Sequence, residues 1–488
     1  MTAAKECIKR KTMPRLHQSR FAVPFYIFTF YLGFYLVSAQ GILSVADSRV
    51  NFQMVWALVE TNSLTIDCEI REDFIEVSPS GKCYSKYDLG LAVTSIPFYL
   101  LGRALYGPAP PGADIISKAQ IVVGMFTQFV TAATCAVLYL LASNLLDSHK
   151  KAFDLVMLFG ICTIAWPYSS QFLSQPFVAL LLLVAVFILI KGKGNPTQSG
   201  YAIAGLALGW ACFTRLDTVP LALITSGYAF FQLRQKSWPW YAVCRFMAFL
   251  LLPVLLAIIA YLVYQFIRSG QWLQIGYEGE GWDTPFALGL YGLLFSPGKG
   301  LSFYSPLAIL AFVGLRQLWQ RGRQAEVALI GTLFIVQLAI YASWWAWDGG
   351  WTWGPRFLVS TQPLLILGLS PWLNRPKQSW LLLALATLGY FIQMIGVATD
   401  PINYLGMTHF SYEQTLFTPV ASPIWGQLQD LRQLRVVLFV ANQGHGLFTK
   451  IEMIIFILAS VLLMVFGGIQ AVRTVRREAD KAHEPSGG

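Results

Sequence analysis

Apolar runs recur along the whole 488-residue chain, and most are close to the length of a helix that crosses a lipid bilayer. Such a helix needs about 20 consecutive, mainly apolar residues. The runs that we interpret as spans are 22–44, 115–142, 153–168, 175–190, 200–214, 218–233, 241–267, 304–319, 327–346, 355–371, 379–397 and 451–470. These twelve spans predict an all-α, polytopic membrane protein whose two ends lie on the same side of the membrane.

One further apolar run, 89–106, contains Pro97. If this run crossed the membrane, every later loop would change sides, and the basic loops would face outward. The positive-inside rule favours the other arrangement, in which the run is a re-entrant or interfacial hairpin. The net charge is then +15 inside and −5 outside, which together give the formal charge of +10. We therefore expect twelve to thirteen transmembrane or re-entrant helices, with both termini in the cytoplasm and the protein in the cell inner (plasma) membrane.

The composition agrees with this class of protein. Hydrophobic residues make up 56% of the chain, charged residues only 12%, and the mean hydropathy is +0.55. A soluble domain carries about twice that proportion of charge. Because the excess of positive charge is explained by the cytoplasmic loops, it does not indicate binding to nucleic acid. The expected surroundings are membrane lipids.

The outer face carries the longer loops, so we expect the chemistry there. The predicted organisation is a cytoplasmic basic tail at 1–21, a transmembrane core at 22–397 that includes the outer loop 45–114, a small outer region at 398–450, a last span at 451–470 and a cytoplasmic tail at 471–488. The outer loop 45–114 is expected to carry juxtamembrane helices, because its early part shows mostly helical apolar spacing.

Asp47 follows the first predicted span and precedes that helical stretch. An ionisable residue at such a position is a candidate functional group in a membrane protein. One interpretation is a general base at the membrane surface. The other is a helix N-cap, a position at which Asp is favoured. Both interpretations can hold together.

Four cations map to the same face as Asp47 and are candidate ligands of a phosphate group: Lys86, Arg215, Lys299 and Arg356. Lys binds phosphate as a point charge, and Arg offers a planar fork of donors. Each has a simpler interpretation. Arg215 could form a local ion pair with Asp217, and Lys299 lies in a Ser-Pro-Gly-Lys-Gly-Leu segment that could be a plain turn.

Five tryptophans fall within the ten residues 344–353. Aromatic faces stack on the C–H faces of sugars, so this segment is a candidate sugar or acceptor site. The residues that we assign to it are Trp347, Asp348, Trp351 and Trp353, together with Tyr87. The alternative is an interfacial belt of aromatic residues, which many membrane proteins have.

Cys68 and Cys83 share the first outer loop, and we expect a disulfide between them if that face is oxidising. The alternative is two free thiols. No His/Cys cluster has the spacing of metal ligands. We therefore predict no metal and no cofactor, while leaving a divalent metal open.

These residues together suit a lipid-linked sugar donor, since cations can hold a phosphate leaving group while an acid deprotonates an acceptor hydroxyl. At these residues the chain resembles integral-membrane glycosyltransferases of the GT-C fold, and it is similar to the bacterial relatives of protein O-mannosyltransferases and of the lipid A aminoarabinose transferase. The matching positions are Asp47, Lys86–Gly90, Pro97–Gly102, Thr214-Arg215, Ser296–Leu301 and Trp353–Leu358.

The resemblance implies an inverting glycosyltransferase with a periplasmic active site in the cell envelope and Asp47 as base. Its partners would be a polyprenyl-phosphate-linked sugar donor and a glycan, lipid or protein acceptor. The chain departs from the family pattern at Asp88-Leu89, where Pro-Pro is usual. A second family acid has four candidates, Glu60, Asp67, Glu69 and Asp73, although solvated loop charges explain them better.

Two other classes of function stay open at this point. A polytopic transporter or flippase of a lipid-linked sugar would need charges within several spans, and these spans are nearly free of acids. A non-catalytic membrane scaffold would tolerate the loss of Asp47 and Arg356 together.

Overall fold

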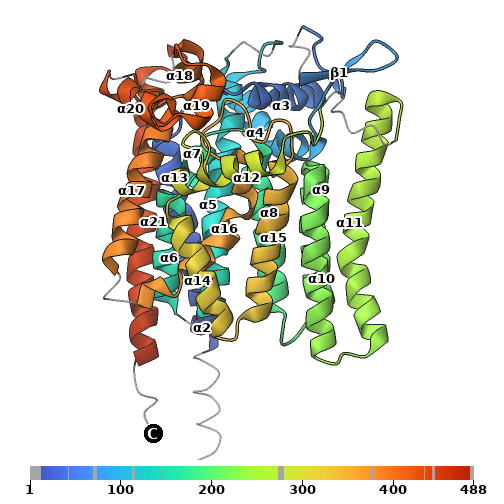
Figure 1. Ribbon diagram of the computed structural model, residues 1–488, viewed down its shortest axis with the longest axis vertical. Coiled ribbons are helices and arrows are strands. Elements are labelled where there is room, and N and C mark those ends of the chain that lie inside the picture. The colour runs from blue at the N-terminus through green and yellow to red at the C-terminus, as the bar shows by residue number, and fades with distance from the viewer. Residues whose placement is uncertain are drawn as a thin grey trace, which may run out of the picture.

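The computed structural model describes residues 13–483 except 42, 70–73, 113–115, 147, 273–279, 375–378, 434 and 442–445. The predicted tail 1–21 therefore lies largely outside the described residues, as do Asp73 and the basic pair Arg375 and Lys377. Figure 1 shows a bundle of helices with its long axis vertical and with α3 and α18–α20 gathered at one end. We call this the α3 end.

The helices of the first half are α2 (Met13–Val37), α3 (Ala46–Trp56), α4 (Leu89–Tyr106), α5 (Lys118–Leu146), α6 (His149–Cys162), α7 (Ala165–Ser169), α8 (Ser174–Lys191), α9 (Gln198–Thr214), α10 (Val219–Gln235) and α11 (Trp240–Ser269). Those of the second half are α12 (Phe286–Phe295), α13 (Leu301–Tyr304), α14 (Leu307–Gln320), α15 (Gln324–Ala342), α16 (Gln362–Leu365), α17 (Ser379–Ala398), α18 (Pro401–Met407), α19 (Tyr412–Phe417), α20 (Pro423–Arg432) and α21 (Lys450–His483). Short helical turns are η1 (Ala57–Thr61), η3 (Leu216–Thr218), η4 (Arg356–Thr361), η5 (Ile366–Leu369), η6 (Trp372–Asn374) and η8 (Pro419–Ala421).

The chain is a multi-pass membrane protein. Seven described helices are long and apolar enough to cross a membrane, namely α4, α5, α8, α11, α15, α17 and α21. Shorter apolar helices accompany them at Phe21–Val37, Phe286–Phe295, Leu307–Gln320 and Arg356–Leu369. The all-α architecture is thus confirmed, whereas the number of crossings stays a prediction.

The outer loop 45–114 contains helices and one small hairpin. Strand β1 (Ile75–Val77) pairs antiparallel with β2 (Cys83–Ser85), so that Val77 lies opposite Cys83. A disulfide joins Cys68 to Cys83. The hairpin thus fixes the backbone just before Lys86.

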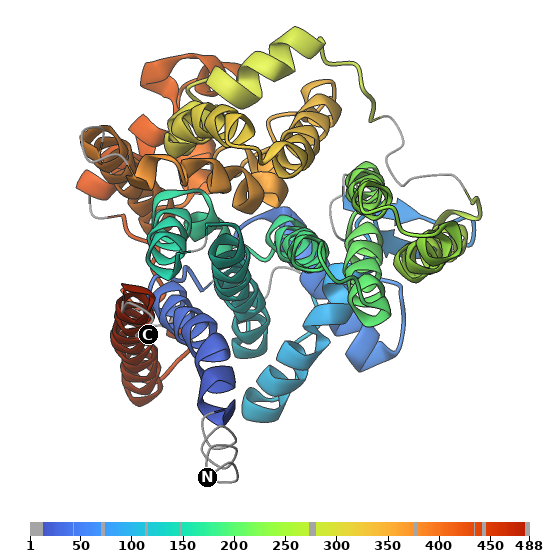
Figure 2. The ribbon, with the colours of Figure 1, turned by 90° about the horizontal axis from the view of Figure 1, so that it is seen from below.

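The expected hairpin at 89–106 is wrong in its shape, because α4 is one continuous helix that passes through Pro97. A proline removes one backbone donor, and a membrane helix tolerates this loss where neighbouring groups compensate. The middle of α4 and the residues just beyond its C-terminal end lie near the end of α3. Tyr99 donates to Glu60 just beyond α3 (2.7 Å), and Trp56 donates to the Ala109 carbonyl just beyond α4 (2.9 Å). Figure 2, viewed along the bundle, shows α4 (light blue) lengthwise. The structure therefore agrees with a helix that returns the chain to the same end.

The basic loops gather at the end opposite α3. Lys193, after α8, pairs with Glu326 in the first turn of α15 (3.1 Å), and Arg323 donates to the Leu145 carbonyl at the end of α5 (3.0 Å). Figure 1 shows the α10–α11 and α14–α15 connections at the same end. This segregation is what the positive-inside rule predicts for an end that faces the cytoplasm. Which end faces the cytoplasm stays a prediction.

A close approach between two helices positions part of the site. Gly90, in the first turn of α4, lies against Thr214 at the end of α9, where an added Cβ would collide with the threonine. Only glycine allows backbones to come this close. The approach places Asp88, just before α4, near Arg215, just after α9.

Candidate active site

A large cavity of about 1600 Å³ opens at the α3 end of the bundle. Six of the residues predicted from the sequence line it, namely Asp47, Lys86, Tyr87, Arg215, Trp351 and Arg356. They come from four separate segments of the chain, at 47, 86–87, 215 and 351–356. Such a large concave site with a few convergent polar groups is the usual form of a binding site for a small molecule.

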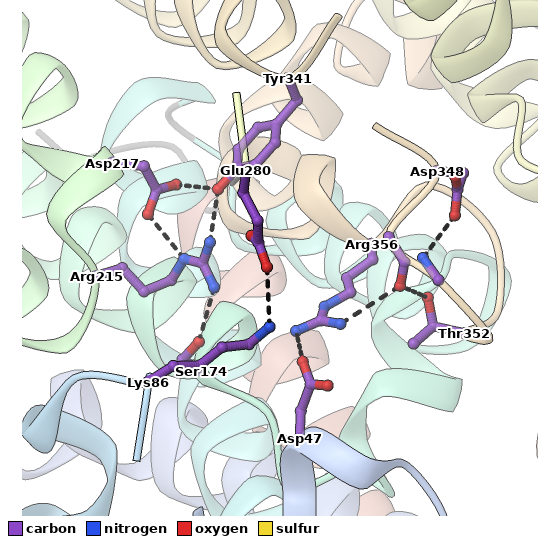
Figure 3. Close-up of polar contacts among 12 residues, drawn as sticks. Asp47, Lys86, Ser174, Arg215, Asp217, Glu280, Tyr341, Asp348, Thr352 and Arg356 are labelled. Atoms are coloured by element: carbon purple, nitrogen blue, oxygen red, sulfur yellow. Dashed lines mark hydrogen bonds and ion pairs between the residues drawn. The ribbon is translucent and has the colours of Figure 1, made fainter. Parts of the chain in front are cut away.

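Asp47 and Arg356 form a buried ion pair in this cavity. Asp47 lies in the first turn of α3, and Arg356 begins η4; each residue is only 8% exposed. Arg356 Nη2 donates to Asp47 Oδ2 (Figure 3). The N-cap interpretation of Asp47 is wrong, because Val45 occupies the N-cap position and Asp47 lies inside the helix. A carboxylate in the first turn is stabilised by the helix dipole.

The neighbours of Asp47 favour its ionised form. Burial alone would raise the pKa of this carboxyl, but the positive charge of Arg356 and its hydrogen bond outweigh that effect, with help from Tyr87 and Lys86. The pKa of Asp47 therefore lies below its ordinary value of 3.8. The group is a carboxylate at neutral pH and can accept a hydrogen bond or a proton.

Arg356 has further partners that fix its guanidinium. Nη1 donates to the Gly349 carbonyl at 3.4 Å. With the Gln175 amide oriented to satisfy its neighbours, Gln175 Oε1 accepts from Arg356 Nε at 3.0 Å and from Arg215 Nη1 at 3.1 Å. Gln175 thereby bridges two arginines of the cavity.

Arg215 is held by a network on one side of the cavity. Nε donates to Asp217 (2.9 Å), Nη1 to Ser174 (3.2 Å) and Nη2 to the Tyr341 hydroxyl (2.6 Å), which itself donates to Asp217 (2.5 Å) (Figure 3). The local ion pair with Asp217 that the sequence left open is therefore present. Because Arg215 also lines the cavity, its charge still contributes to the potential there.

Lys86 directly follows β2, and its side chain lines the cavity. Its ammonium pairs with Glu280 at 3.2 Å and lies 5.1 Å from the centre of the Phe74 ring. Figure 3 shows Lys86 and Glu280 between the groups around Arg215 and Arg356. Lys86 thus adds a second cation on the Asp47 side of the cavity.

Lys299 lies elsewhere. Its side chain is not part of the cavity lining, and the residue is only 1% exposed. The ammonium donates to the Gly350 and Thr352 carbonyls at 2.5 and 2.7 Å. Burial lowers the pKa of Lys299 to about 8, although the charge of Asp348 opposes this effect. We call residues 344–353 the tryptophan loop. The Lys299 ammonium lies on the side of this loop that faces away from the cavity and holds its backbone through these two hydrogen bonds.

The residues of the tryptophan loop fall into two groups, those that line the cavity and those that are buried behind it. Trp351 lines the cavity and is 43% exposed, whereas Trp347 and Trp353 are buried away from it. Trp353 packs edge-on against Tyr304 (4.9 Å between ring centres), and Trp347 packs against Phe417 (5.9 Å). Asp348 accepts from the Gly350 amide and the Tyr412 hydroxyl, each at 2.6 Å. These three residues give the loop its shape.

Several cavity residues were missed by the sequence reasoning: Glu76, Glu280, Trp282, Tyr341, Trp344 and Trp345. Gln175, which bridges two arginines of the cavity, was missed as well. Glu76, Glu280, Trp282 and Tyr341 lie in stretches with no local sequence signal. Trp344 and Trp345 were within the tryptophan-rich segment, and their membership of the cavity follows only from how the loop folds.

Three of the four candidate second acids, Glu60, Asp67 and Glu69, do not line the cavity, and Asp73 lies outside the described residues. Glu60 pairs with Arg103 (3.4 Å) and Tyr99, while Asp67 and Glu69 are exposed loop residues. Asp88 does line it, at the position where the sequence departs from the family pattern. Burial raises the pKa of Asp88 to about 7, against the opposing charges of Arg268 and Arg215. Among the residues that the structure describes, no three His, Cys, Asp or Glu side chains gather as metal ligands would.

No protein-family model and no curated relative matches this chain. The chain is similar to the solved structure of ArnT from Cupriavidus metallidurans bound to undecaprenyl phosphate, at 10% identity over 94% of this chain and 77% of that one, with a TM-score of 0.47. The same protein in its apo state gives 12% identity over 96% and 78% of the two chains and a TM-score of 0.49.

The oligosaccharyltransferase of Archaeoglobus fulgidus, in complex with zinc and sulfate, gives 11% identity over 77% of this chain and a TM-score of 0.45. This chain spans only 54% of that protein's length. One of these proteins is bound to undecaprenyl phosphate, and the other is an oligosaccharyltransferase. What the chain itself displays is a multi-pass helical membrane protein with a buried acid–arginine pair in a large cavity at one end.

Proposed function

We propose that this protein is a membrane glycosyltransferase that moves a sugar from a polyprenyl-phosphate carrier to an acceptor hydroxyl, with Asp47 as the general base. The observation that carries the proposal is the ion pair of Asp47 and Arg356 inside a cavity of about 1600 Å³, beside Lys86 and Arg215. A carboxylate among several cations suits a reaction that removes a proton at one point and releases a phosphate at another.

The proposed step is a single displacement. The acceptor oxygen forms a bond to the anomeric carbon as its proton passes to Asp47, and the bond between that carbon and the carrier phosphate breaks. The electron pair of that bond stays on the phosphate, which leaves as polyprenyl phosphate. Attack from the face opposite the phosphate inverts the anomeric configuration.

The cations would stabilise the departing phosphate. Arg356 and Lys86 face the cavity within ion-pair distance of Asp47 and Glu280 respectively, so their charges already lie where an anion would enter. Fixed charges in a partly dehydrated site stabilise developing negative charge without having to reorganise. Arg215 would add long-range attraction and, through Gln175, help to orient Arg356.

The aromatic residues would hold the sugar. Trp351 and Tyr87 line the cavity and are the two members of the predicted aromatic set that are placed to stack on a sugar ring. Trp347, Trp353 and Asp348 would act indirectly by keeping the loop folded. The acceptor, whether a glycan, a lipid or a protein, would enter the same cavity.

The site would lie on the outer face of the inner membrane, with both termini in the cytoplasm. This proposal is supported by the position of the basic loops at the end opposite the cavity, which is the end expected to face the cytoplasm. The disulfide between Cys68 and Cys83 is also at the α3 end, and disulfides persist in oxidising compartments.

The test is a survey of purified protein in lipid nanodiscs with a panel of polyprenyl-phosphate sugars, assayed for release of polyprenyl phosphate. Release that depends on an acceptor supports the transferase. Movement of intact lipid-linked sugar across liposomes, without release, would instead identify a flippase. The matched control is Glu60→Gln, which removes an acid near the end of α3 that is outside the cavity.

A further inference from the structure

The turn between Asp348 and Thr352 touches Arg356 on one side and Lys299 on the other. We infer that Lys299 is a positioning residue, which sets the orientation of Arg356 by holding this turn, and that Tyr412 joins the outer region 398–450 to the same turn. The inference rests on the proposed function, because it assigns Arg356 to the carrier phosphate. It replaces the direct phosphate contact that the sequence predicts for Lys299.

The turn has a backbone that only glycine adopts easily. Gly349 has φ of 72° and Gly350 has φ of 69°, both in the left-handed region. The Gly349 carbonyl accepts from Arg356 Nη1 (3.4 Å) and from the Thr352 hydroxyl (3.1 Å). A Cβ added at Gly349 would lie 3.0 Å from Arg356 Cβ and 3.2 Å from its Cδ. The stem and the head of Arg356 therefore both contact this turn.

Lys299 holds the turn from behind. Its ammonium donates to two carbonyls, those of Gly350 and Thr352, which flank Trp351. A buried ammonium is costly unless its donors are paired, so these bonds are a strong constraint on the backbone. The loop that carries Lys299 is itself fixed, since the Lys299 amide donates to the Ser296 hydroxyl (3.1 Å).

The outer region holds the turn at a second point. Tyr412, the first residue of α19, donates its hydroxyl to Asp348 Oδ1 at 2.6 Å, and the same oxygen accepts from the Gly350 amide. A further contact runs from the Gly298 amide, in the Lys299 loop, to the Leu416 carbonyl in α19 (3.0 Å). Helix α19 thus contacts both the turn and the loop that supports it.

The two roles for Lys299 predict different couplings to Arg356. A direct phosphate ligand would add its own share of binding, so the losses from removing Lys299 and Arg356 would multiply. A positioning residue acts through Arg356, so its removal would cost little once Arg356 is gone. A double-mutant cycle separates these cases, because contacting or linked residues give non-additive effects.

The experiment measures binding of undecaprenyl phosphate, the probe, to nanodisc-embedded Lys299→Met, Arg356→Gln and the double variant. Each single change is expected to weaken binding by about tenfold or more, the scale of one lost hydrogen bond to a charged group. The double variant is expected to bind within about twofold of Arg356→Gln. Losses that multiply would show that Lys299 contacts the phosphate and would overturn the inference.

A second, milder variant keeps the inference testable if Lys299→Met fails to fold. Tyr412→Phe keeps the ring and removes only the hydroxyl, so it is expected to weaken binding a few-fold alone and to have no effect beside Arg356→Gln. Equal effects in both backgrounds would overturn the role of Tyr412. Undecaprenyl-phosphate binding by the wild type, together with turnover, tests the proposed function separately.

Hydrogen exchange gives a readout that needs no ligand. Residues 349–358 are expected to exchange faster in Lys299→Met and Tyr412→Phe than in the wild type, with Glu60→Gln as the control. If the wild type did not bind undecaprenyl phosphate, the proposed function would fail. The exchange rates alone would then show whether Lys299 and Tyr412 hold the turn. Unaltered exchange in Lys299→Met would overturn the inference.

Discussion

Gly349 and Gly350 offer a matched pair of substitutions that isolates the contact with Arg356. Both have left-handed backbones, with φ of 72° and 69°, so alanine strains each by a similar amount. A Cβ at Gly350 meets nothing within 4 Å, whereas a Cβ at Gly349 meets Arg356 at 3.0 and 3.2 Å. Gly349→Ala therefore differs from Gly350→Ala mainly in displacing the Arg356 side chain.

The magnitudes follow from these contacts. A left-handed conformation costs an L-residue about 1–2 kcal/mol, and this cost applies to both variants. A Cβ contact at 3.0 Å requires Arg356 to move by a few tenths of an ångström. Weakening one hydrogen bond between charged partners, here that of Arg356 with Asp47, costs about 1.5–3 kcal/mol. We therefore expect kcat/KM of Gly349→Ala to fall about 10-fold to 150-fold below that of Gly350→Ala.

The assay has two parts. Thermal unfolding in nanodiscs is expected to show a lower transition temperature for both variants than for the wild type, because they share the backbone cost. The transition temperature of Gly349→Ala should be the lower of the two, because its ion pair with Asp47 is weakened as well. Turnover of a polyprenyl-phosphate sugar is expected to separate them. If the two variants unfolded alike and also had equal kcat/KM, the displacement of Arg356 would have no consequence and its assignment to the reaction would be refuted.

Three further predictions concern the acid at 88, the disulfide and the topology. Burial raises the pKa of Asp88 from 3.8 to about 7 in the folded protein. Between about pH 4 and pH 7, Asp88 is therefore protonated in the folded protein and ionised in the unfolded chain. The thermal stability of the protein should therefore fall as pH rises from about 4 to 7, and Asp88→Asn should lack this part of the decline; parallel curves would contradict it. Replacing Cys68 and Cys83 by Ser opens a loop with a sequence separation of 15 and should cost about 3 kcal/mol of stability, which differential scanning calorimetry would detect as a lower transition temperature. Single cysteines at 107–112 should react with a membrane-impermeant reagent from outside, as should those at 408–411, and labelling only from the cytoplasm would reverse the topology.

The sequence predicted which charged residues lie at the cavity end of the bundle better than it predicted which way their side chains point. Asp47, Lys86, Arg215 and Arg356 were identified by charge at the ends of apolar runs, and the fold brings all four to one cavity. Lys299 met the same criterion but points behind the tryptophan loop. Charge and position along the chain locate a residue at one end of the bundle, whereas the side of a turn on which it lies depends on its backbone dihedrals.

Long-range partners could not be predicted at all. Glu280 meets Lys86 across 194 residues and Tyr341 meets Arg215 across 126 residues, and neither has a local sequence signal. The proline in α4 misled in a different way. A proline predicts a break in a water-exposed helix, but an apolar surrounding makes it costly to leave backbone groups unpaired and so favours a continuous helix.

The most direct measurement is the turnover of Asp47→Asn on the donor that the wild type accepts, together with its affinity for that donor. The amide keeps the size of the carboxylate and cannot take the acceptor's proton, so release of polyprenyl phosphate should fall by about 100-fold or more. Donor affinity should change far less, because the amide oxygen can still accept from Arg356. Turnover within a few-fold of the wild type would show that Asp47 is not the base and would contradict the proposed mechanism.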